Sequence, residues 1–436
     1  METAIGDDYF DGTSSLERVR RHFKIAHELG VKYLRCGFSW NAIEKSQGVY
    51  DWRFWDILVQ EAERTHIELM PYVAYTPQWA AGSTKEFWSQ PPRSNDLYAE
   101  FMYQAASRYR GKIHSWEIWN EPDNREYWQG STEGYAQLVS EAAVRIRKAD
   151  PSVVLVLGGM SLGPSVFFRD LVEKFQIDSY VDVIAMHAYP ETWGQERVEH
   201  IYRDWVPAMA ELIRHEGSGV DFWANELGYA DFRFSPTQAS KWGSSVFYKY
   251  EHTSDYAATF LFKSEVMALA SHRVSLAGWY RIDDFTLDTP HVSDDEVNFH
   301  LGLFDPKGNP KPGFYALRFF NQLFDQPVQH IETQVGRPAG SQSDVELFRR
   351  KNGSVVLIGW LRSSEASEVP PNRGMLQDAR QEKVTVGLPC SSISQTREYD
   401  AEGRLLPANL SFANHSLQGI DLRGDRVTVA VVNCAQ

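Results

Sequence analysis

Two glutamates lie at the ends of runs that are typical of buried strands, a position that suits acid–base chemistry. Glu121 follows the run Ile113 to Trp119 and precedes Pro122, which cannot continue strand pairing. Glu226 ends a second run, Val220 to Glu226, next to Asn225. A lone glutamate at a strand end more often caps a helix or pairs with an arginine. A carboxyl group in a partly apolar pocket, however, has a raised pKa and can serve as a general acid.

The surroundings of Glu121 favour the general-acid interpretation. Trp116, Trp119 and Trp128 flank it in the sequence. Aromatic residues make up 13% of the chain, including 14 tryptophans, and such rings either bury large faces or stack on ligands. The net charge is -14, and the lysines and arginines are scattered along the chain. This charge argues against nucleic acid or an anionic membrane as a partner and favours a neutral ligand.

The cysteines and the N-terminal residues indicate a cellular compartment. The three cysteines, Cys36, Cys390 and Cys434, show no CxxC or metal-ligand spacing, so we expect no disulfide framework and no metal site. Residues Met1 to Asp11 lack the basic and apolar regions of a signal peptide, and no apolar run is long enough to span a membrane. We therefore expect a cytoplasmic protein, although a secreted chain trimmed of its leader would look the same.

The chain alternates between helical and strand patterns. Apolar residues recur at helical spacing from Ser14 to Gly30, and the run Val31 to Phe38 then reads as a strand. The same unit of a helix followed by a strand recurs six times. The later predicted strands are Ile67 to Tyr75, Ile113 to Trp119, Val153 to Gly159, Val181 to Tyr189, Val220 to Glu226 and Ser275 to Ile282.

This alternation predicts a closed (β/α)₈ barrel, also called a TIM barrel, over residues 1–322. The eighth strand has to come from Glu2 to Gly6, which is weak by composition. A doubly wound sheet that binds a nucleotide typically has a Gly-rich, phosphate-binding turn after its first strand, and the sequence has no such turn there. Residues 323–436 read as short strands and turns, including a hairpin signal at Asn352-Gly353, and we expect a small antiparallel β-sandwich there.

A barrel of this kind gathers its chemistry at the carboxyl ends of its strands. The predicted strand ends supply two arginines, two carboxylates, a histidine and several aromatic rings. The candidates are Arg35, Trp40, Tyr75, Trp79, Asn120, Glu121, His187, Tyr189, Asn225, Glu226, Trp279 and Arg281. Paired acids among aromatic rings are what the cleavage of a glycosidic bond requires.

The two glutamates are expected to have different roles. With Arg35 nearby and a hydrogen bond from Tyr189, Glu226 stays ionised and can attack the anomeric carbon, while Glu121 protonates the leaving oxygen. We expect His187 to orient Tyr189, Glu121 or a sugar hydroxyl. Asn120 is expected to contact the 2-hydroxyl, and Trp279 to form the floor under a sugar ring.

The joint pattern resembles the clan A retaining glycoside hydrolases over residues 14 to about 322. It stands here as Leu34-Arg35-Cys36, Trp119-Asn120-Glu121-Pro122, His187-Ala188-Tyr189, Ala224-Asn225-Glu226 and Gly278-Trp279-Tyr280. The phrases Phe38-Ser39-Trp40-Asn41, Gly48-Val49-Tyr50-Asp51-Trp52 and Thr76-Pro77-Gln78-Trp79 look most like the families of β-xylosidases and α-L-iduronidases. The resemblance implies that Glu121 is the acid/base and Glu226 the nucleophile, that the anomeric configuration is retained, and that no cofactor is needed. Trp40, Trp79 and Trp128 are also candidate substrate contacts.

Two loop regions have ambiguous interpretations. The run from Asp283-Asp284 to Asp294-Asp295-Glu296 is rich in carboxylates and could hold Ca²⁺, although its spacing fits no known loop and a solvated loop is the simpler interpretation. Aromatic residues in the loops after the sixth and seventh strands are candidates for further sugar subsites, with loop packing as the alternative. They are Trp193, Tyr229, Phe232, Phe234 and Trp242.

Several functions stay open at this point. The first is an exo-acting β-glycosidase of the β-xylosidase type, with an endo-acting β-glycanase on the same scaffold as its alternative. The second is a barrel that binds sugar without cleaving it. The third is a metal-dependent barrel enzyme, for which only His187 is well placed as a ligand. The sequence does not indicate which sugar is bound or how many chains assemble.

Overall fold

A computed structural model describes most of the chain, and within it the chain forms two compact units. The described residues are 1–9, 12–83, 85–190, 192, 197–214, 219–231, 253–286, 300–362, 378–407 and 410–435. The first unit comprises Met1–Ala188, Ile201–Leu227 and Ser271–Ile282; the second comprises Tyr189–His200, Gly228–Ala270 and Asp283–Gln436.

The first unit contains the predicted barrel: eight parallel strands that pair in chain order and close on themselves. They are β1 (Glu2–Gly6), β2 (Tyr33–Ser39), β3 (Glu68–Ala74), β4 (Ser115–Ile118), β5 (Val154–Met160), β6 (Val183–Ala188), β7 (Asp221–Leu227) and β8 (Leu276–Tyr280). The weak candidate Glu2 to Gly6 does form the first strand. It closes the barrel because it pairs on both edges, Ala4 opposite Tyr33 of β2 and Ile5 opposite Trp279 of β8.

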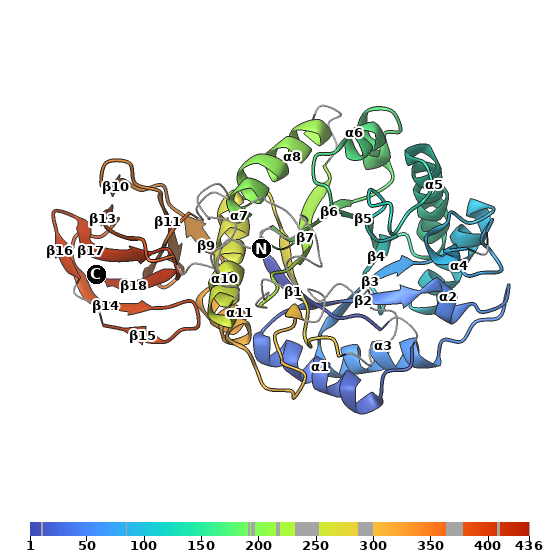
Figure 1. The fold of residues 1–436 in the computed structure, drawn as a ribbon, viewed down its shortest axis with the longest axis horizontal. Helices are drawn as coiled ribbons and strands as arrows, with labels where there is room; N and C mark the ends of the chain where they lie inside the picture. The colour runs from blue at the N-terminus through green and yellow to red at the C-terminus, as the bar shows by residue number, and fades with distance from the viewer. Residues whose placement is uncertain are drawn as a thin grey trace, which may run out of the picture. The chain divides into compact units, whose positions relative to one another are not determined.

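Helices cover the outside of the barrel strands (Figure 1). They are α1 (Leu16–Leu29), α2 (Trp40–Ile43), α3 (Arg53–Thr65), α4 (Asn95–Arg108), α5 (Thr132–Ala149), α6 (Val166–Glu173) and α8 (Val206–Arg214), with the short 3₁₀ helices η1 (Phe87–Ser89) and η2 (Ile177–Ser179) and the π-helix η3 (Ile201–Trp205). Helix α1 shows how its ends are encoded. The Ser15 hydroxyl accepts the Arg18 amide at the start, and Gly30 takes a left-handed φ of 75° at the end.

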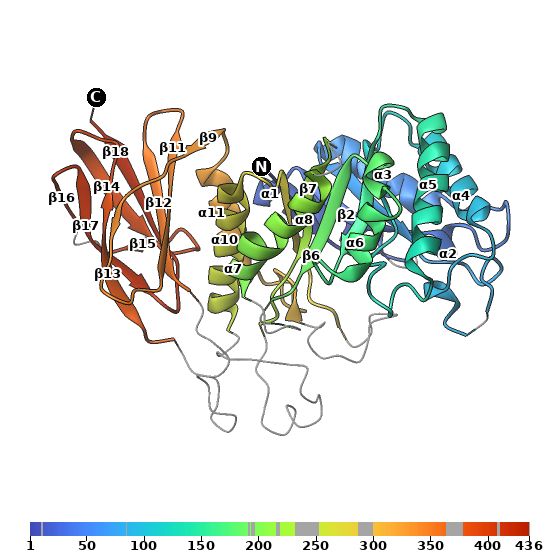
Figure 2. The same ribbon diagram turned by 90° about the horizontal axis from the view of Figure 1, so that it is seen from above.

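The second unit contains two antiparallel sheets and the helices α7 (Val198–His200), α10 (Ser254–Ser271) and α11 (Pro312–Leu323). The smaller sheet consists of β10 (Val335–Gly336), β13 (Gln381–Gly387), β17 (Ser416–Arg423) and β16 (Ser411–Ala413). The larger consists of β15 (Leu405–Leu406), β14 (Ile393–Tyr399), β18 (Thr428–Cys434), β12 (Val355–Leu361), β11 (Ser343–Arg350) and β9 (Val328–His330). Figure 2 shows the two sheets as separate layers.

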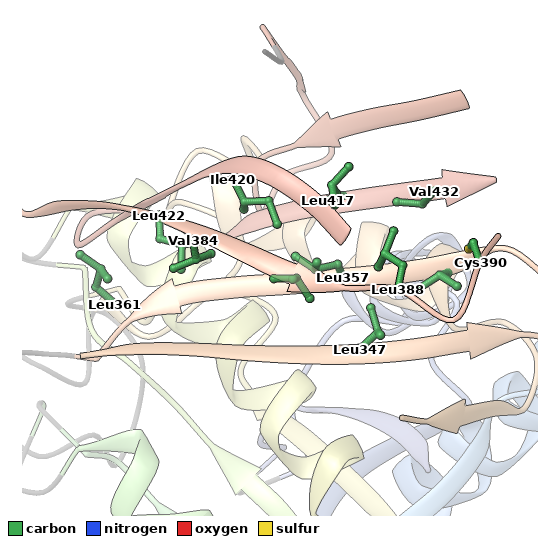
Figure 3. Packing of buried hydrophobic residues seen from close by; sticks show 13 residues of the cluster. Leu347, Leu357, Leu361, Val384, Leu388, Cys390, Leu417, Ile420, Leu422 and Val432 are labelled. Carbon is green, nitrogen blue, oxygen red and sulfur yellow. The ribbon is translucent and has the colours of Figure 1, made fainter. Parts of the chain in front are cut away.

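The inner faces of the two sheets form one apolar core, as in a β-sandwich (Figure 3). Leu347 and Leu357 of the larger sheet pack in the same cluster as Val384 and Leu422 of the smaller one. The sequence did not predict β17, because its alternation is broken: Gly419 has a φ of 82° and the register against β13 shifts there. The antiparallel sandwich itself is confirmed.

One prediction about the cysteines is wrong. Cys390 and Cys434, 44 positions apart, form a disulfide, whereas Cys36 is buried and free. Sequence spacing gave no sign of this pair because it depends on strand pairing: β14 lies beside β18 with Ile393 opposite Cys434. The ends of the two strands therefore bring the cysteines together.

Two buried acidic residues of the second unit have contrasting surroundings. Glu199 of α7 accepts a hydrogen bond from Lys263 of α10 at 3.0 Å and one from the Trp360 indole at 3.3 Å. Glu265, also on α10, is fully buried, and neither of its oxygens has a hydrogen-bond partner among the described residues.

In the described part of the chain, no helix combines the length and the apolar character needed to cross a bilayer.

Candidate active site

The chain turns sharply where strand β4 ends, and this turn presents Glu121. Strand β4 stops at Ile118, after which Trp119 and Glu121 have positive φ values of 75° and 44°. Such backbone angles are costly for residues with side chains and persist only where the surroundings enforce them. Here the Trp119 indole donates to the Tyr127 carbonyl at 3.0 Å and its ring packs on Trp128 at 5.1 Å. The strained turn is therefore held in place by packing.

Glu121, His187 and Glu226 meet at the carboxyl ends of β4, β6 and β7. The His187 Nδ1 atom lies 2.8 Å from Glu121 Oε1 and 3.6 Å from Glu226 Oε2. One ligand atom from each of the three side chains lies within 4.8 Å of the others. The side chains of Glu121 and Glu226 are 10% and 12% exposed, so neither is fully shielded from solvent.

Arg35 of β2 ties this group together. Its Nη1 atom forms an ion pair with Glu226, and its Nη2 atom donates to Asn120 Oδ1 at 2.9 Å. Its Nε and Nη2 atoms also donate to the two oxygens of Glu117, at 2.8 and 2.9 Å. The predicted residues Arg35, Asn120, Glu121, His187 and Glu226 are thus brought together in one cluster.

Glu117 is the member of the cluster that the sequence did not predict. It lies inside β4, with 1% of its surface exposed, and also accepts hydrogen bonds from Asn225 at 2.9 Å and from the Gly159 amide at 3.1 Å. The signal was present in the sequence as a charged residue within an apolar strand. A Cβ atom at Gly159 would come within 2.0 Å of His187 Nε2, so the histidine requires a glycine on β5.

Burial and neighbouring charges shift the pKa values of Glu117, His187 and Glu121. Burial alone would raise the pKa of Glu117, but the charge and hydrogen bonds of Arg35, together with the nearby His187, lower it to about 2. Burial and Arg35 would lower the pKa of His187, but Glu226, Glu117 and Glu121 raise it to about 9. Burial, supported by the charge of Glu226, raises the pKa of Glu121. The cluster therefore favours a protonated His187 and a protonated Glu121 beside an ionised Glu117.

The tryptophans predicted as sugar contacts have different surroundings. Trp40 is fully buried, and its indole donates a hydrogen bond to Glu44 Oε2 at 2.6 Å. Trp128 is also buried, and its indole donates a hydrogen bond to the Ser131 carbonyl at 3.2 Å. Trp79 is half-buried beneath the guanidinium of Arg93. Trp279 lies on β8 and is 2% exposed.

A group of three half-buried rings, two of which interact with the charges of Glu121 and Glu226, was not singled out as a group by the sequence. It consists of Tyr75, Trp88 and Tyr127. Tyr75 and Tyr127 stack with ring centres 6.3 Å apart, and the Trp88 ring meets Tyr75 edge-on at 5.4 Å. The Tyr75 hydroxyl accepts a hydrogen bond from Asn120 at 3.3 Å. Burial raises the pKa of both tyrosines, and the charges of Glu121 and Glu226 add to this effect.

The remaining loop predictions have mixed outcomes. Tyr189 directly follows β6 and is half-buried. Tyr229 is buried against Tyr256 and Phe260, which agrees with the alternative of loop packing. Four other aromatic candidates lie outside the described residues: Trp193, Phe232, Phe234 and Trp242.

The acidic run after β8 does not begin as a solvated loop. Asp284 is buried, and Lys311 Nζ bridges it to Asp231 at 2.8 and 2.7 Å. Burial raises the pKa of Asp284 to about 7 although Lys311 opposes this shift. The prediction of a solvated loop is therefore wrong for Asp284, whereas Asp294, Asp295 and Glu296 lie outside the described residues.

The cluster has the residue types of a metal site, but its charges suit proton transfer better. Glu121, His187 and Glu226 could each offer one ligand atom to a cation. Arg35 already neutralises Glu226, and a histidine with a pKa of about 9 would have to lose its proton to bind a metal. Two close carboxyl groups, one protonated and one paired with a cation, can instead supply an acid and a nucleophile.

Comparison with known proteins identifies the family. The model of glycosyl hydrolases family 39 matches residues 12–364. The chain is 24% identical over 334 residues to the beta-xylosidase of Caldicellulosiruptor saccharolyticus, covering 70% of this chain and 65% of that protein. It is 21% identical over 295 residues to the beta-xylosidase of Geobacillus stearothermophilus, covering 64% and 54%. The chain thus spans less than two thirds of the length of both relatives.

Solved structures share the fold at lower identity. The family 39 glycoside hydrolase from the gut symbiont Bacteroides cellulosilyticus WH2 superposes with a TM-score of 0.73 at 16% identity, covering 99% of this chain and 81% of that one. The GH39 beta-xylosidase from Caulobacter crescentus gives a TM-score of 0.62 at 17% identity, covering 99% and 96%. The family match confirms the resemblance to the β-xylosidase type of clan A. Because the family model runs from just before the first barrel helix through strand β12 of the sandwich, the chain belongs to glycosyl hydrolases family 39.

Proposed function

We propose that the protein is a retaining glycoside hydrolase that cleaves a β-linked glycoside, with Glu226 as nucleophile and Glu121 as acid/base. The observation that carries this proposal is the approach of one oxygen of each residue to within 4.8 Å. Inverting enzymes separate their two carboxyl groups by roughly 6.5–9.5 Å to admit a water molecule, whereas retaining enzymes hold them about 5–5.5 Å apart. The short separation therefore favours a covalent intermediate.

In the first step, Glu226 attacks the anomeric carbon while Glu121 gives its proton to the leaving oxygen. The ion pair with Arg35 holds the Glu226 carboxylate in place for this attack. The raised pKa of Glu121 favours the protonated form that this step requires. The cleaved bond is the one between the anomeric carbon and the leaving oxygen, and the new bond joins that carbon to Glu226.

In the second step, Glu121 removes a proton from water, which displaces Glu226 from the anomeric carbon. Protonated His187 lies 2.8 Å from Glu121 Oε1 and stabilises the carboxylate that exists between the two steps. Two displacements return the anomeric carbon to its original configuration. Asn120, held by Arg35 and Tyr75, is the candidate for the contact with the sugar 2-hydroxyl.

The substrate we infer is a β-xyloside that is cut at a chain end. This inference takes its support from the two relatives that are named beta-xylosidase. The half-buried rings of Tyr75, Trp88 and Tyr127 provide a stacking surface for a sugar, since pyranose rings pack well on aromatic faces. Trp40, Trp79, Trp128, Tyr189 and Trp279 stay predicted contacts.

Variants of the two glutamates test the mechanism. Glu226→Ala is expected to lower kcat by about 10⁴-fold or more, and added azide should restore turnover with an inverted glycosyl azide as product. Glu121→Ala should form the glycosyl-enzyme from an activated aryl β-xyloside but hydrolyse it slowly, and azide should give a product of retained configuration. Glu126→Ala is the matched control, because Glu126 is an exposed carboxylate of the same loop. Wild-type rates in both active-site variants would refute the assignment.

Product analysis separates the alternatives of substrate use. Xylo-oligosaccharides of two to six units should release xylose as the first product if the enzyme trims chain ends, whereas an endo-acting enzyme would release shorter oligomers first. Binding of xylobiose by calorimetry without turnover would favour a non-catalytic sugar-binding barrel. Loss of activity in EDTA and its recovery with a divalent cation would favour a metal-dependent enzyme.

A further inference from the structure

Glu117 is a charge in the middle of a buried strand, and the whole cluster is built around it. Its carboxylate accepts four hydrogen bonds, two from Arg35, one from Asn225 and one from the Gly159 amide. The donors belong to β2, β7 and β5, so one side chain of β4 joins three other strands. A buried charge is tolerated where it is paired and fully hydrogen-bonded, and Glu117 meets both conditions.

Glu117 fixes the plane of the Arg35 guanidinium. The Nε and Nη2 atoms meet separate oxygens of Glu117, at 2.8 and 2.9 Å, in the two-point contact that a planar guanidinium forms with a carboxylate. With the plane fixed in this way, the remaining Nη1 atom is directed at Glu226. An arginine held at one point only could rotate away from that carboxylate.

Glu117 also acts on the far side of His187. The Nδ1 atom of the imidazole faces Glu121 at 2.8 Å and Glu226 at 3.6 Å, while Nε2 faces Glu117 at 3.8 Å, an ion-pair distance that is too long for a hydrogen bond. Burial and the charge of Arg35 favour the neutral ring, and the three carboxylates oppose them. The imidazole therefore has a carboxylate beside each of its two nitrogens.

We infer that Glu117 is a positioning residue of the active site, which holds Arg35 against Glu226 and keeps the His187 imidazolium beside Glu121. The carboxylate of Glu117 faces both cations of the cluster, Arg35 at 2.8 Å and His187 at 3.8 Å, and offsets part of their positive charge. Without Glu117 the cluster would be more positive by one charge. That charge would oppose the positive charge that develops on the sugar in an oxocarbenium-like transition state.

The test is Glu117→Gln, which keeps the side-chain volume and removes the charge. The ¹⁵N-histidine NMR titration of His187, assigned by comparison with His187→Gln, should give a midpoint near 9 in the wild type. In the variant the midpoint should fall by about one pH unit or more, because a neighbouring negative charge is lost. A midpoint that is the same in both proteins, or near 6.5 in the wild type, would overturn the inference.

Kinetics provide the second readout, and this part rests on the proposed function. Glu117→Gln should lower kcat by about 100-fold and change KM much less, since the loss concerns the transition state and the placement of Arg35. A merely structural role would lower the melting temperature without moving the His187 titration, and that result would count against the inference. If Glu117→Gln does not fold, Glu117→Asp keeps the charge but shortens the reach to Arg35; it should lower kcat and leave the His187 midpoint above 6.5.

The control for both the His187 titration and the kinetics is Glu61→Gln on helix α3. Glu61 is also a buried carboxylate paired with arginines, Arg20 at 2.9 Å and Arg64 at 2.7 Å, but it lies on an outer helix. We expect this variant to leave kcat and the His187 titration unchanged.

If the Glu121 and Glu226 variants refute glycoside cleavage while the His187 midpoint still depends on Glu117, the proposed function fails and the electrostatic role stands. If the enzyme cleaves the glycoside but the His187 midpoint does not depend on Glu117, the electrostatic role fails and the proposed function stands.

Discussion

Replacing Glu265 by glutamine should stabilise the protein at neutral pH. Glu265 lies on α10, is fully buried, and has no hydrogen-bond partner for either oxygen among the described residues. Burial alone raises its pKa to about 8 from an ordinary value of 4.5. The folded protein therefore keeps this proton at neutral pH, whereas the unfolded chain releases it.

The sign and size of the effect follow from this pKa difference. A group whose pKa is higher in the folded state contributes most to stability below its unfolded pKa, and this contribution is lost as the pH rises toward the folded value. Between pH 4.5 and pH 7 the loss is on the order of 3 kcal/mol, because each pH unit costs about 1.4 kcal/mol. Glutamine has a similar volume and does not titrate, so the variant avoids this loss.

Thermal melting at several pH values tests the reasoning. A chain of 436 residues has an unfolding entropy of roughly 0.9 kcal/mol/K, so Glu265→Gln should raise the melting temperature by about 3 to 4 °C at pH 7. The gain should shrink to near zero at pH 4.5. Asp255→Asn, which removes an exposed charge from the same helix, is the control and should shift melting by about 1 °C or less. A gain that does not change between pH 4.5 and pH 7, or no gain at all, would refute a protonated buried Glu265.

Three further predictions concern the site and the disulfide. Gly159→Ala should lower kcat by about 100-fold, because its Cβ atom would lie 2.0 Å from His187 Nε2 and displace the ring. The control is Gly82→Ala, whose Cβ atom would meet nothing within 4 Å and should leave kcat unchanged. Equal rates in both variants would contradict the packing argument. Reduction of the Cys390–Cys434 disulfide should destabilise the second unit by up to about 4 kcal/mol, since the bond closes a 44-residue loop. Thermal melting with and without dithiothreitol measures this loss of stability. Identical melting curves would contradict a structural role for the disulfide. EDTA should leave the rate of xyloside hydrolysis unchanged because Glu226 is already neutralised by an arginine, and a metal requirement would contradict this.

The sequence by itself determined the barrel and the candidate pair of carboxyl groups. Helical and strand periods alternate along the chain, and Ser15 and Gly30 mark helix ends by local hydrogen bonding and backbone freedom. Parallel strands of a closed barrel present their carboxyl ends at one face, so Glu121 and Glu226 could be expected to approach each other although they lie far apart in the chain. These features depend on neighbouring residues and on a general rule of the fold, and both can be read from one sequence.

The tertiary structure decided which side chains meet. Glu117 looked like one charge within an apolar strand, and its importance depends on the partners that β2, β5 and β7 bring to it. Cys390 found Cys434 because two strands of the sandwich pair, and the burial of Trp40 depends on packing against Tyr98 and Phe101. A pattern along the chain records the period of an element and where it ends. Which residues face each other across strands is fixed only when the barrel closes and the sheets pair, because those contacts join segments that are distant in the sequence.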